Sequence, residues 1–308
     1  MSPTQPRAGE FVVQALTALD ADLAAAAPRV FEASDAEAIH DLRVALRRLR
    51  TLLRLARGVL GRFHSDAVRA ALGDIQRATG ALRDAEVVDE LFAELAIDAE
   101  PFTSWRARRR TTERARRRDV LAKLASGDLD RARHLLGALL ALPVNPSRDV
   151  DAAKLARRAV RSAEHGVVSH GTVDVSDVTA LHELRIAYKR LRYAAEMLKD
   201  ALPPELFALR ERAVLMQKRL GEIHDVDVAL DLARRARSLA PVLQTQVLSA
   251  LREERLHRVD KYLRALSPSA ASHSEKSPPS EEPRLHSADR PTRAERSRSS
   301  SRDPFRRR

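Results

Sequence analysis

The chain has 308 residues, enough for one large domain or two ordinary ones. It contains no cysteine, which excludes disulfides and thiolate chemistry, and its 55 Lys and Arg against 43 Asp and Glu leave a net charge of +12. A surplus of this size indicates a polyanionic partner, such as nucleic acid, an acidic membrane surface or another phosphate polymer.

The first residues, MSPTQPRAGEFVVQAL, contain an early arginine and no continuous apolar block, so we expect no secretory signal. The longest apolar stretches, LDADLAAAA and LLGALLALPV, are shorter than a helix that spans a bilayer, so no membrane partner is expected. Together these features predict a soluble protein of the cytoplasm.

Amphipathic helices are predicted along most of the chain. From about residue 10 to 266, Leu, Ala, Val and Ile recur at i, i+3, i+4 and i+7, and no alternating β-type run stands out. Gly, Pro, Ser and Asp interrupt this pattern in GVLGRFH, SGDLD, LPVNPSRDV and HGVVSHGTVDVSD. The fold class is therefore predicted to be all-α. After Ser267 the sequence is rich in Ser, Pro and Arg with few apolar residues, which predicts a disordered tail over 267–308.

Two sequence blocks occur twice, 141 or 142 residues apart. IHDLRVALRRLR at 39–50 returns as LHELRIAYKRLR at 181–192, and IQRATGALRDAEVV from Ile75 returns as MQKRLGEIHDVDVA from Met216. A third pair, ERARRRD and EERLHRVD, is fainter. We interpret the chain as two copies of one helical unit, 10–142 and 150–266, each with room for about four helices in an antiparallel bundle.

The repeated basic helix carries its positive charge on one face. At 3.6 residues per turn, the basic residues and the histidine of the first copy fall within an arc of about 80° and extend over about 21 Å along the helix axis. The leucines of the same helix form a separate apolar stripe. The first basic stripe is His40, Arg43, Arg47, Arg50 and Arg54. The second basic stripe is His182, Arg185, Lys189 and Arg192.

Neither basic stripe contains an acidic residue. Like charges at i,i+3 and i,i+4 destabilise a helix by about 0.2–0.5 kcal/mol per pair, so a stripe of one sign is locally unfavourable. Because the arrangement recurs in both copies, it indicates an external anion. The acidic Asp41 and Glu183 fall on the other side of their helices, near Arg48 and Arg190, for which we expect ion pairs on the outer face.

The histidines of the stripes are interpreted as anion contacts rather than as catalysts, because they lie in line with the arginines. No HxxxH or HExxH spacing is present, so neither a metal site nor a cofactor is predicted. Asp84 and Asp225 in the second block are interpreted as helix caps or as partners of stripe arginines. Arg114 and Arg255 occupy the faintly matched positions of the last helix in each copy and complete the candidate contact set.

These motifs resemble the CHAD family (conserved histidine α-helical domain), over about residues 10–266. The resemblance implies two four-helix bundles with approximate two-fold symmetry, whose basic helices line a groove that binds inorganic polyphosphate, and an association with polyphosphate granules. The ligand contacts that it implies are His40, Arg43, Arg47 and Arg50 with His182, Arg185, Lys189 and Arg192. CHAD domains are often fused to a triphosphatase domain with an ExExK motif, which this sequence lacks, so no catalysis is implied.

Two other functions are also compatible with the sequence. A binder of nucleic-acid phosphate backbones is the main alternative, and weak nucleic-acid binding is compatible with the charge, although aromatic residues make up only 4% of the chain and no helix-turn-helix or zinc pattern occurs. A metal-dependent phosphoanhydride hydrolase is less favoured, because there is no GxxxxGK[ST] motif and Asp84, Glu86, Asp225 and Asp227 are a weak basis for a metal site.

Overall fold

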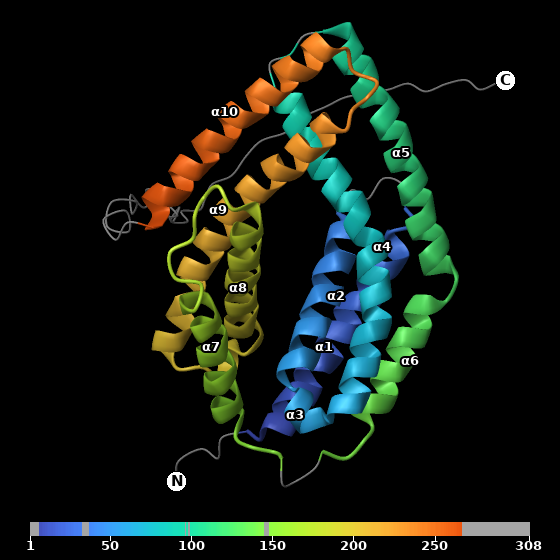
Figure 1. Ribbon diagram of the computed structural model, residues 1–308. Helices are drawn as coiled ribbons and strands as arrows, with labels where there is room; N and C mark the ends of the chain where they lie inside the picture. The colour runs from blue at the N-terminus through green and yellow to red at the C-terminus, as the bar shows by residue number, and fades with distance from the viewer. Residues whose placement is uncertain (1–5, 33–36, 96, 98, 145–147, 267–308) are drawn as a thin grey trace, which may run out of the picture. The chain divides into compact units, whose positions relative to one another are not determined.

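A computed structural model describes residues 6–32, 37–95, 97, 99–144 and 148–266 (Figure 1). These residues form helices and no strand, apart from one isolated backbone bridge between Arg7 and Asp151, so the predicted all-α class is confirmed. The predicted disordered tail lies outside the described residues.

The helices can be assigned to the two copies of the sequence repeat. The first copy contains α1 (Ala8–Arg29), α2 (Ala38–Leu55), the short α3 (Arg57–Leu60), α4 (Arg62–Glu94), α5 (Glu100–Ala125) and α6 (Asp128–Leu140). The second copy contains α7 (Ala152–Val168), α8 (Val178–Met197), a 3₁₀ turn (Lys199–Ala201), α9 (Pro204–Arg234) and α10 (Pro241–Leu266). The two copies of the first sequence block lie on α2 and α8, and the two copies of the second block lie on α4 and α9.

Local sequence explains several helix boundaries. Gly61 between α3 and α4 has φ +94°, and Gly127 between α5 and α6 has φ +79°, both in the region where a residue with a Cβ is strained. The side chain of Asp177 accepts a hydrogen bond of 2.9 Å from the backbone N–H of Ala180, which caps the start of α8. The segments that were expected to interrupt the helices therefore do interrupt them, through the glycines and the aspartate named here.

Each copy contributes most of one hydrophobic core. In the first copy, α1, α2, α4 and α6 bury leucines that include Leu16, Leu42 and Leu136. In the second copy, α7 to α10 bury Leu184, Met216 and others. The leucines of α2 predicted to face inward are fully buried, which turns the opposite side of the helix toward the second copy.

A third core joins the two copies. α4 and α9 are the longest helices, with 33 and 31 residues, and their C-terminal halves meet α5 and α10 (Figure 1). Phe92 packs edge-to-face against Phe102 and Trp105 in this cluster, at centroid distances of 6.0 and 5.1 Å. The copies are therefore joined by shared apolar packing in this cluster. They are also joined in the first core, which includes Ala156 and Leu198 of the second copy. Helices α2 and α8 run alongside each other between them.

Helix α1 is long and apolar enough to cross a membrane, judged by length and composition alone. The expectation that no segment meets that criterion was therefore wrong. Its Val12, Leu16 and Leu23 are completely buried against the rest of the first copy, as in a core helix.

Candidate anion-binding groove

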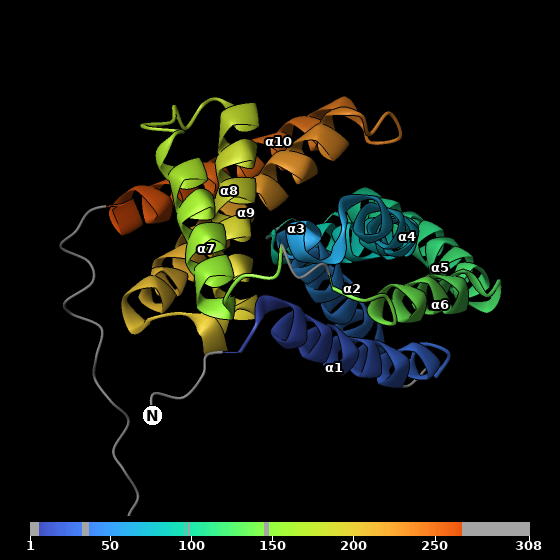
Figure 2. The same ribbon diagram turned by 90° about the horizontal axis from the view of Figure 1, so that it is seen from below.

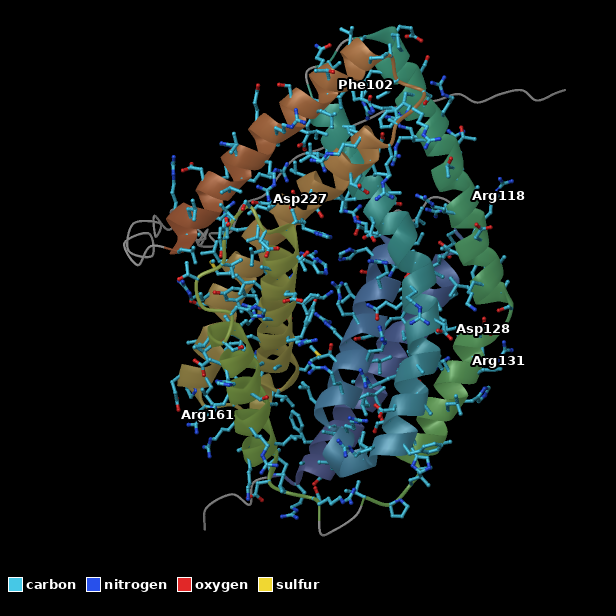
Figure 3. The ribbon with its side chains drawn as sticks, viewed as in Figure 1. Phe102, Arg118, Asp128, Arg131, Arg161 and Asp227 are labelled. Atoms are coloured by element: carbon cyan, nitrogen blue, oxygen red, sulfur yellow. The ribbon has the colours of Figure 1, made fainter. Side chains whose placement is uncertain are left out.

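The two basic stripes face each other from α2 and α8. A cleft of about 510 Å³ lies between them, bounded by Arg47, Arg50 and Arg54 on one side and by Lys189 and other α8 residues on the other. Figure 3 shows side chains with nitrogen tips projecting into the space between these helices. The structure thus brings together the cations that sequence spacing placed on separate helices.

Arginines of the first basic stripe are held by neutral groups. Arg50 donates from Nη1 to Oε1 of Gln76 at 2.6 Å and from Nε to the backbone carbonyl of Arg69 at 3.2 Å. Arg43 lies 3.4 Å from the hydroxyl of Thr79. Burial lowers the pKa of both guanidinium groups. Among the residues that the structure describes, neither arginine has a carboxylate within ion-pair distance, so their charge is available to a ligand.

Glycines of the second sequence block lie beside stripe arginines. A Cβ added at Gly80 would lie 3.5 Å from Nη1 of Arg43, and a Cβ at Gly221 would lie 3.5 Å from Nε of Arg185, both ordinary van der Waals distances. The two glycines are counterparts in the repeat, as are the two arginines. In each copy a stripe arginine therefore lies against the same position of the neighbouring long helix.

The second basic stripe is partly neutralised. Arg192 pairs with Glu196 at 2.8 Å, so it is less free to bind an anion than the sequence indicated. Lys189 and Arg185 have no such partner in the described part of the chain, and Nε of Arg185 is buried without a hydrogen bond. Burial, followed by the nearby positive charge of Arg47, lowers the pKa of Lys189 to about 8. An anion in the cleft would relieve this repulsion.

Tyr193 connects the two sides of the cleft. The guanidinium carbon of Arg47 lies 5.4 Å from the centroid of the Tyr193 ring, and that of Arg192 lies at the same distance. These cation–π contacts fix Arg47 across the groove without neutralising it. The side chain of Tyr193 is only 7% exposed, so little of its ring is free for stacking on a ligand.

Histidines occur at the far end of both stripes. His40 is exposed and lines a small cavity of about 90 Å³ with Arg43, Arg83 and Arg117. His182 lies beside His224 of α9, with ring centroids 4.8 Å apart, and its Nδ1 is buried without a hydrogen-bond partner. Burial and then Arg185 lower the pKa of His224. Both stripe histidines therefore lie near stripe arginines, but Glu37 and Glu86 also line the cavity beside His40, and their carboxylates disfavour an anion there.

The repeated aspartates lie close to stripe arginines without forming ion pairs with them. The charge of Asp84 acts on Arg43, and Asp225 is influenced most strongly by Arg185 among the charged groups around it. Burial raises the pKa of Asp225 to about 6 despite the arginines nearby. No group of three or more His, Cys, Asp or Glu side chains in the described ranges is placed to hold a metal ion.

The contacts expected from the last helix of each copy need revision. Arg255 pairs with Asp227 at 2.6 Å and donates to the carbonyl of Val175 at 3.0 Å, so it connects α10 to α9 and to the loop between α7 and α8 (Figure 3 labels Asp227). Arg114 is exposed on α5, and the α5 residue that lines a groove cavity is Arg117, one turn later. Because the third repeated block, on α5 and α10, is only weakly conserved between the copies, the sequence could not show which residues of these helices face the groove.

One interpretation of the outer face was wrong. Arg190 lines the cleft together with Arg54 instead of pairing with Glu183 on the outside. Asp41, expected near Arg48, forms its ion pair with Arg29 of α1 at 2.7 Å. Sequence spacing predicted which side of α8 carries Arg190, but it could not predict where α2 lies beside that helix. The cleft therefore contains Arg190, which was expected on the outer face.

Comparisons with known proteins agree with this architecture. The family model described as the CHAD domain matches residues 14–234. The crystal structure of the CHAD domain from the plant Ricinus communis superposes with a TM-score of 0.63 at 24% identity, covering 86% of this chain and 89% of that one. PptA from Streptomyces chartreusis gives a TM-score of 0.63 at 16% identity, covering 85% and 99%. A search of curated proteins gives no match. Because the family match spans well over half of the sequence, the chain belongs to the CHAD domain family.

Proposed function

We propose that this protein binds inorganic polyphosphate in the groove between α2 and α8, without catalysing a reaction on it. The observation that carries the proposal is the pair of facing basic stripes, whose Arg43, Arg47, Arg185 and Lys189 have no carboxylate at ion-pair distance in the described part of the chain. Polyphosphate is a flexible chain of about one charge per unit, which needs closely spaced cations and no base recognition. Arginine supplies bidentate contacts to its oxygens, and Lys189 supplies a point charge.

The side chains that line the cleft favour polyphosphate over single-stranded nucleic acid. Single-strand binding proteins use exposed aromatic rings as stacking surfaces for bases. The aromatic side chain that lines the cleft is Tyr193, which is nearly buried and lies against two guanidinium groups. A chain of bare phosphates needs no such surface, whereas a nucleotide strand would have to leave its bases unstacked.

Competition binding tests this proposal. A fluorescent long-chain polyphosphate bound to the protein at fixed salt is challenged with unlabelled polyphosphate, duplex DNA, RNA and ATP at equal phosphate concentration. We expect polyphosphate to displace the probe at concentrations at least about tenfold lower than either nucleic acid. Equal displacement by DNA or RNA would show a general polyanion binder and overturn the proposal.

The non-catalytic part of the proposal has its own assay. The protein is incubated with polyphosphate and Mg²⁺ or Mn²⁺, and orthophosphate release is followed over time. We expect release no faster than in protein-free samples. Turnover that disappears in Asp225→Ala, with Asp231→Ala as a control on the same helix, would instead identify a phosphoanhydride hydrolase.

Affinity for polyphosphate is expected to fall as pH rises. Lys189, with a pKa of about 8, loses its charge between pH 7 and 9.5, and Asp225, with a pKa of about 6, gains a negative charge between pH 5 and 7. Both changes weaken attraction for an anion, so the dissociation constant should rise in two steps, each on the order of tenfold if the bound anion shifts the pKa by one unit.

Two variants separate these steps in a titration by fluorescence anisotropy. Lys189→Arg keeps its charge at every pH used and should remove the upper step, and Asp225→Asn should remove the lower one. A wild-type dissociation constant that stays constant from pH 7 to 9.5 would contradict the role assigned to Lys189.

We further propose that the protein acts in the cytoplasm at polyphosphate granules. The support is the binding chemistry, because a protein that binds the polymer accumulates wherever the polymer is concentrated. A fluorescent fusion should colocalise with stained granules, and the Arg43→Glu, Arg185→Glu variant should be diffuse. A wild-type fusion that avoids granules would contradict the proposed location.

A further inference from the structure

A larger cavity opens on the other side of the contact between α2 and α8. Its volume is about 670 Å³, compared with about 510 Å³ for the cleft between the basic stripes, and α2, α7 and α8 form its walls. Figure 2 shows α7 beside α8 from below, with α2 across from them. The cavity adjoins the cleft at Arg54, Ile186 and Arg190, but polyphosphate binding along the stripes does not require it.

Three arginines converge on this cavity from three helices. Arg54 comes from α2, Arg158 from α7 and Arg190 from α8. None of them has an ion pair with another residue of the described ranges, and burial followed by the proximity of Arg190 and Arg69 lowers the pKa of Arg54. Three cations from separate elements around one space form a site for a compact polyanion, such as a di- or triphosphate.

Part of the wall formed by α7 is apolar, beside Arg158 and Ser162 of the same helix. Leu155, Ala159, Ala163 and Gly166 line the cavity at spacings of four, four and three residues, which places them on one face of the helix. Ile186 of α8 lines it as well. Inorganic phosphate gains nothing from such a wall, whereas an organic group gains about 25 cal/mol for each Å² of apolar surface that it buries.

Polar side chains in the lining of this cavity further restrict the kind of ligand that it can bind. The carboxylate of Glu183 and the hydroxyl of Ser162 line the same cavity as the three arginines. A carboxylate repels a ligand that is anionic throughout, but it accepts hydrogen bonds from hydroxyl or amino groups. A ligand that suits all these features carries phosphates at one end and a hydroxylated, partly apolar group at the other. A phospholipid fits less well, because its acyl chains offer no hydrogen-bond donor to Glu183.

We propose that the cavity between α2, α7 and α8 binds a nucleoside triphosphate, with its phosphates on Arg54, Arg158 and Arg190 and its nucleoside against the α7 wall. The volume lies in the range of about 300–1,000 Å³ typical of small-molecule sites. This site shares Arg54 and Arg190 with the cleft between the stripes, and it extends beyond the proposed function through the apolar residues of α7 and Arg158, which do not border that cleft.

Calorimetric titration of the full chain with ATP and with tripolyphosphate tests the proposal, since the two share a triphosphate and only ATP carries a nucleoside. We expect ATP to bind at least about tenfold more tightly, because only its nucleoside reaches the apolar wall. Gly166→Leu should remove this preference. A Cβ at Gly166 would meet no atom within 4 Å, so the new side chain extends into open space at the cavity, and leucine favours the helix more than glycine does.

Matched variants control for unrelated effects. Gly137→Leu makes the same change on α6, where a Cβ also meets nothing within 4 Å, and it should leave ATP affinity unchanged. Arg158→Ala should weaken ATP binding about tenfold or more, while Arg157→Ala, which removes an exposed charge just outside the lining, should change it less than about twofold.

Long-chain polyphosphate binding, measured on the same variants, distinguishes this site from the groove. Gly166→Leu and Arg158→Ala should leave polyphosphate affinity unchanged. Equal affinities for ATP and tripolyphosphate, or unchanged ATP binding by Gly166→Leu, would overturn the nucleotide site and leave the groove proposal intact. Tight ATP binding by a wild-type protein that does not bind polyphosphate would support this site and refute the groove.

Discussion

Reversing one arginine in each basic stripe, as Arg43→Glu with Arg185→Glu, should reduce polyphosphate affinity by roughly 10²–10⁴-fold. Each replaced arginine removes a charge-assisted hydrogen bond of about 1.5–3 kcal/mol and puts a negative charge beside the ligand. The change also removes local repulsion, because Arg43 and Arg185 both act on Lys189. Affinity is measured by anisotropy, and far-UV circular dichroism should show unchanged helicity.

A control variant keeps the change in net charge but moves it away from the groove. Arg157 and Arg161 are exposed on α7, and Figure 3 labels Arg161 on the side of that helix away from α2. Arg157→Glu with Arg161→Glu also lowers the net charge by four, yet we expect an affinity loss of less than about threefold because salt screens distant charges. If both double variants lose the same affinity, the protein attracts polyanions through its total charge and the stripe model is wrong. Should the groove variant unfold, Arg43→Gln with Arg185→Gln provides the same comparison.

Raising salt from 50 to 200 mM should weaken polyphosphate binding roughly 300-fold. Six cations of the two basic stripes have no carboxylate at ion-pair distance in the described part of the chain, namely Arg43, Arg47, Arg50, Arg54, Arg185 and Lys189. With about 0.7 counterion released per neutralised phosphate, as for single-stranded nucleic acid, log K should fall against log salt with a slope near −4.

The same titration on Arg43→Glu with Arg185→Glu should give a slope shallower by at least about 1.4, since two cations no longer take part. A wild-type slope between zero and about −2 would mean that most of these side chains do not contact the ligand. The measurement therefore counts engaged cations, whereas the affinity change in the double variant only establishes that the groove is used.

Periodicity was sufficient to predict the helices and the faces of α2 and α8. The leucines of α2 pointed into the core as expected, and this fixed the direction of Arg43, Arg47 and Arg50. The resemblance of the duplicated motif to CHAD domains then implied the pairing of the two stripes. The proximity of the repeated glycines, Gly80 and Gly221, to Arg43 and Arg185 is visible only in three dimensions, since each arginine belongs to another helix.

The sequence pattern could not predict which side chains of different helices contact each other. The pairing of Arg255 with Asp227 depends on how α10 crosses α9, and the position of Arg190 depends on how closely α8 approaches α2. The use of Arg117 in place of Arg114 reflects a helical phase that a faint repeat could not fix. Arg192 was predicted to contact the anion, although its pair with Glu196 joins a basic and an acidic residue at i,i+4 and so has a spacing that the sequence shows.

The aromatic cluster of Phe92, Phe102 and Trp105 makes one copy of the repeat dependent on the other. Its rings come from the first copy and are covered by Val226, Leu230 and other residues of the second. A single repeat would expose them to water, so one unit without a partner would be prone to self-association. Joining two units in one polypeptide makes that association independent of protein concentration and holds the two basic stripes at a fixed separation.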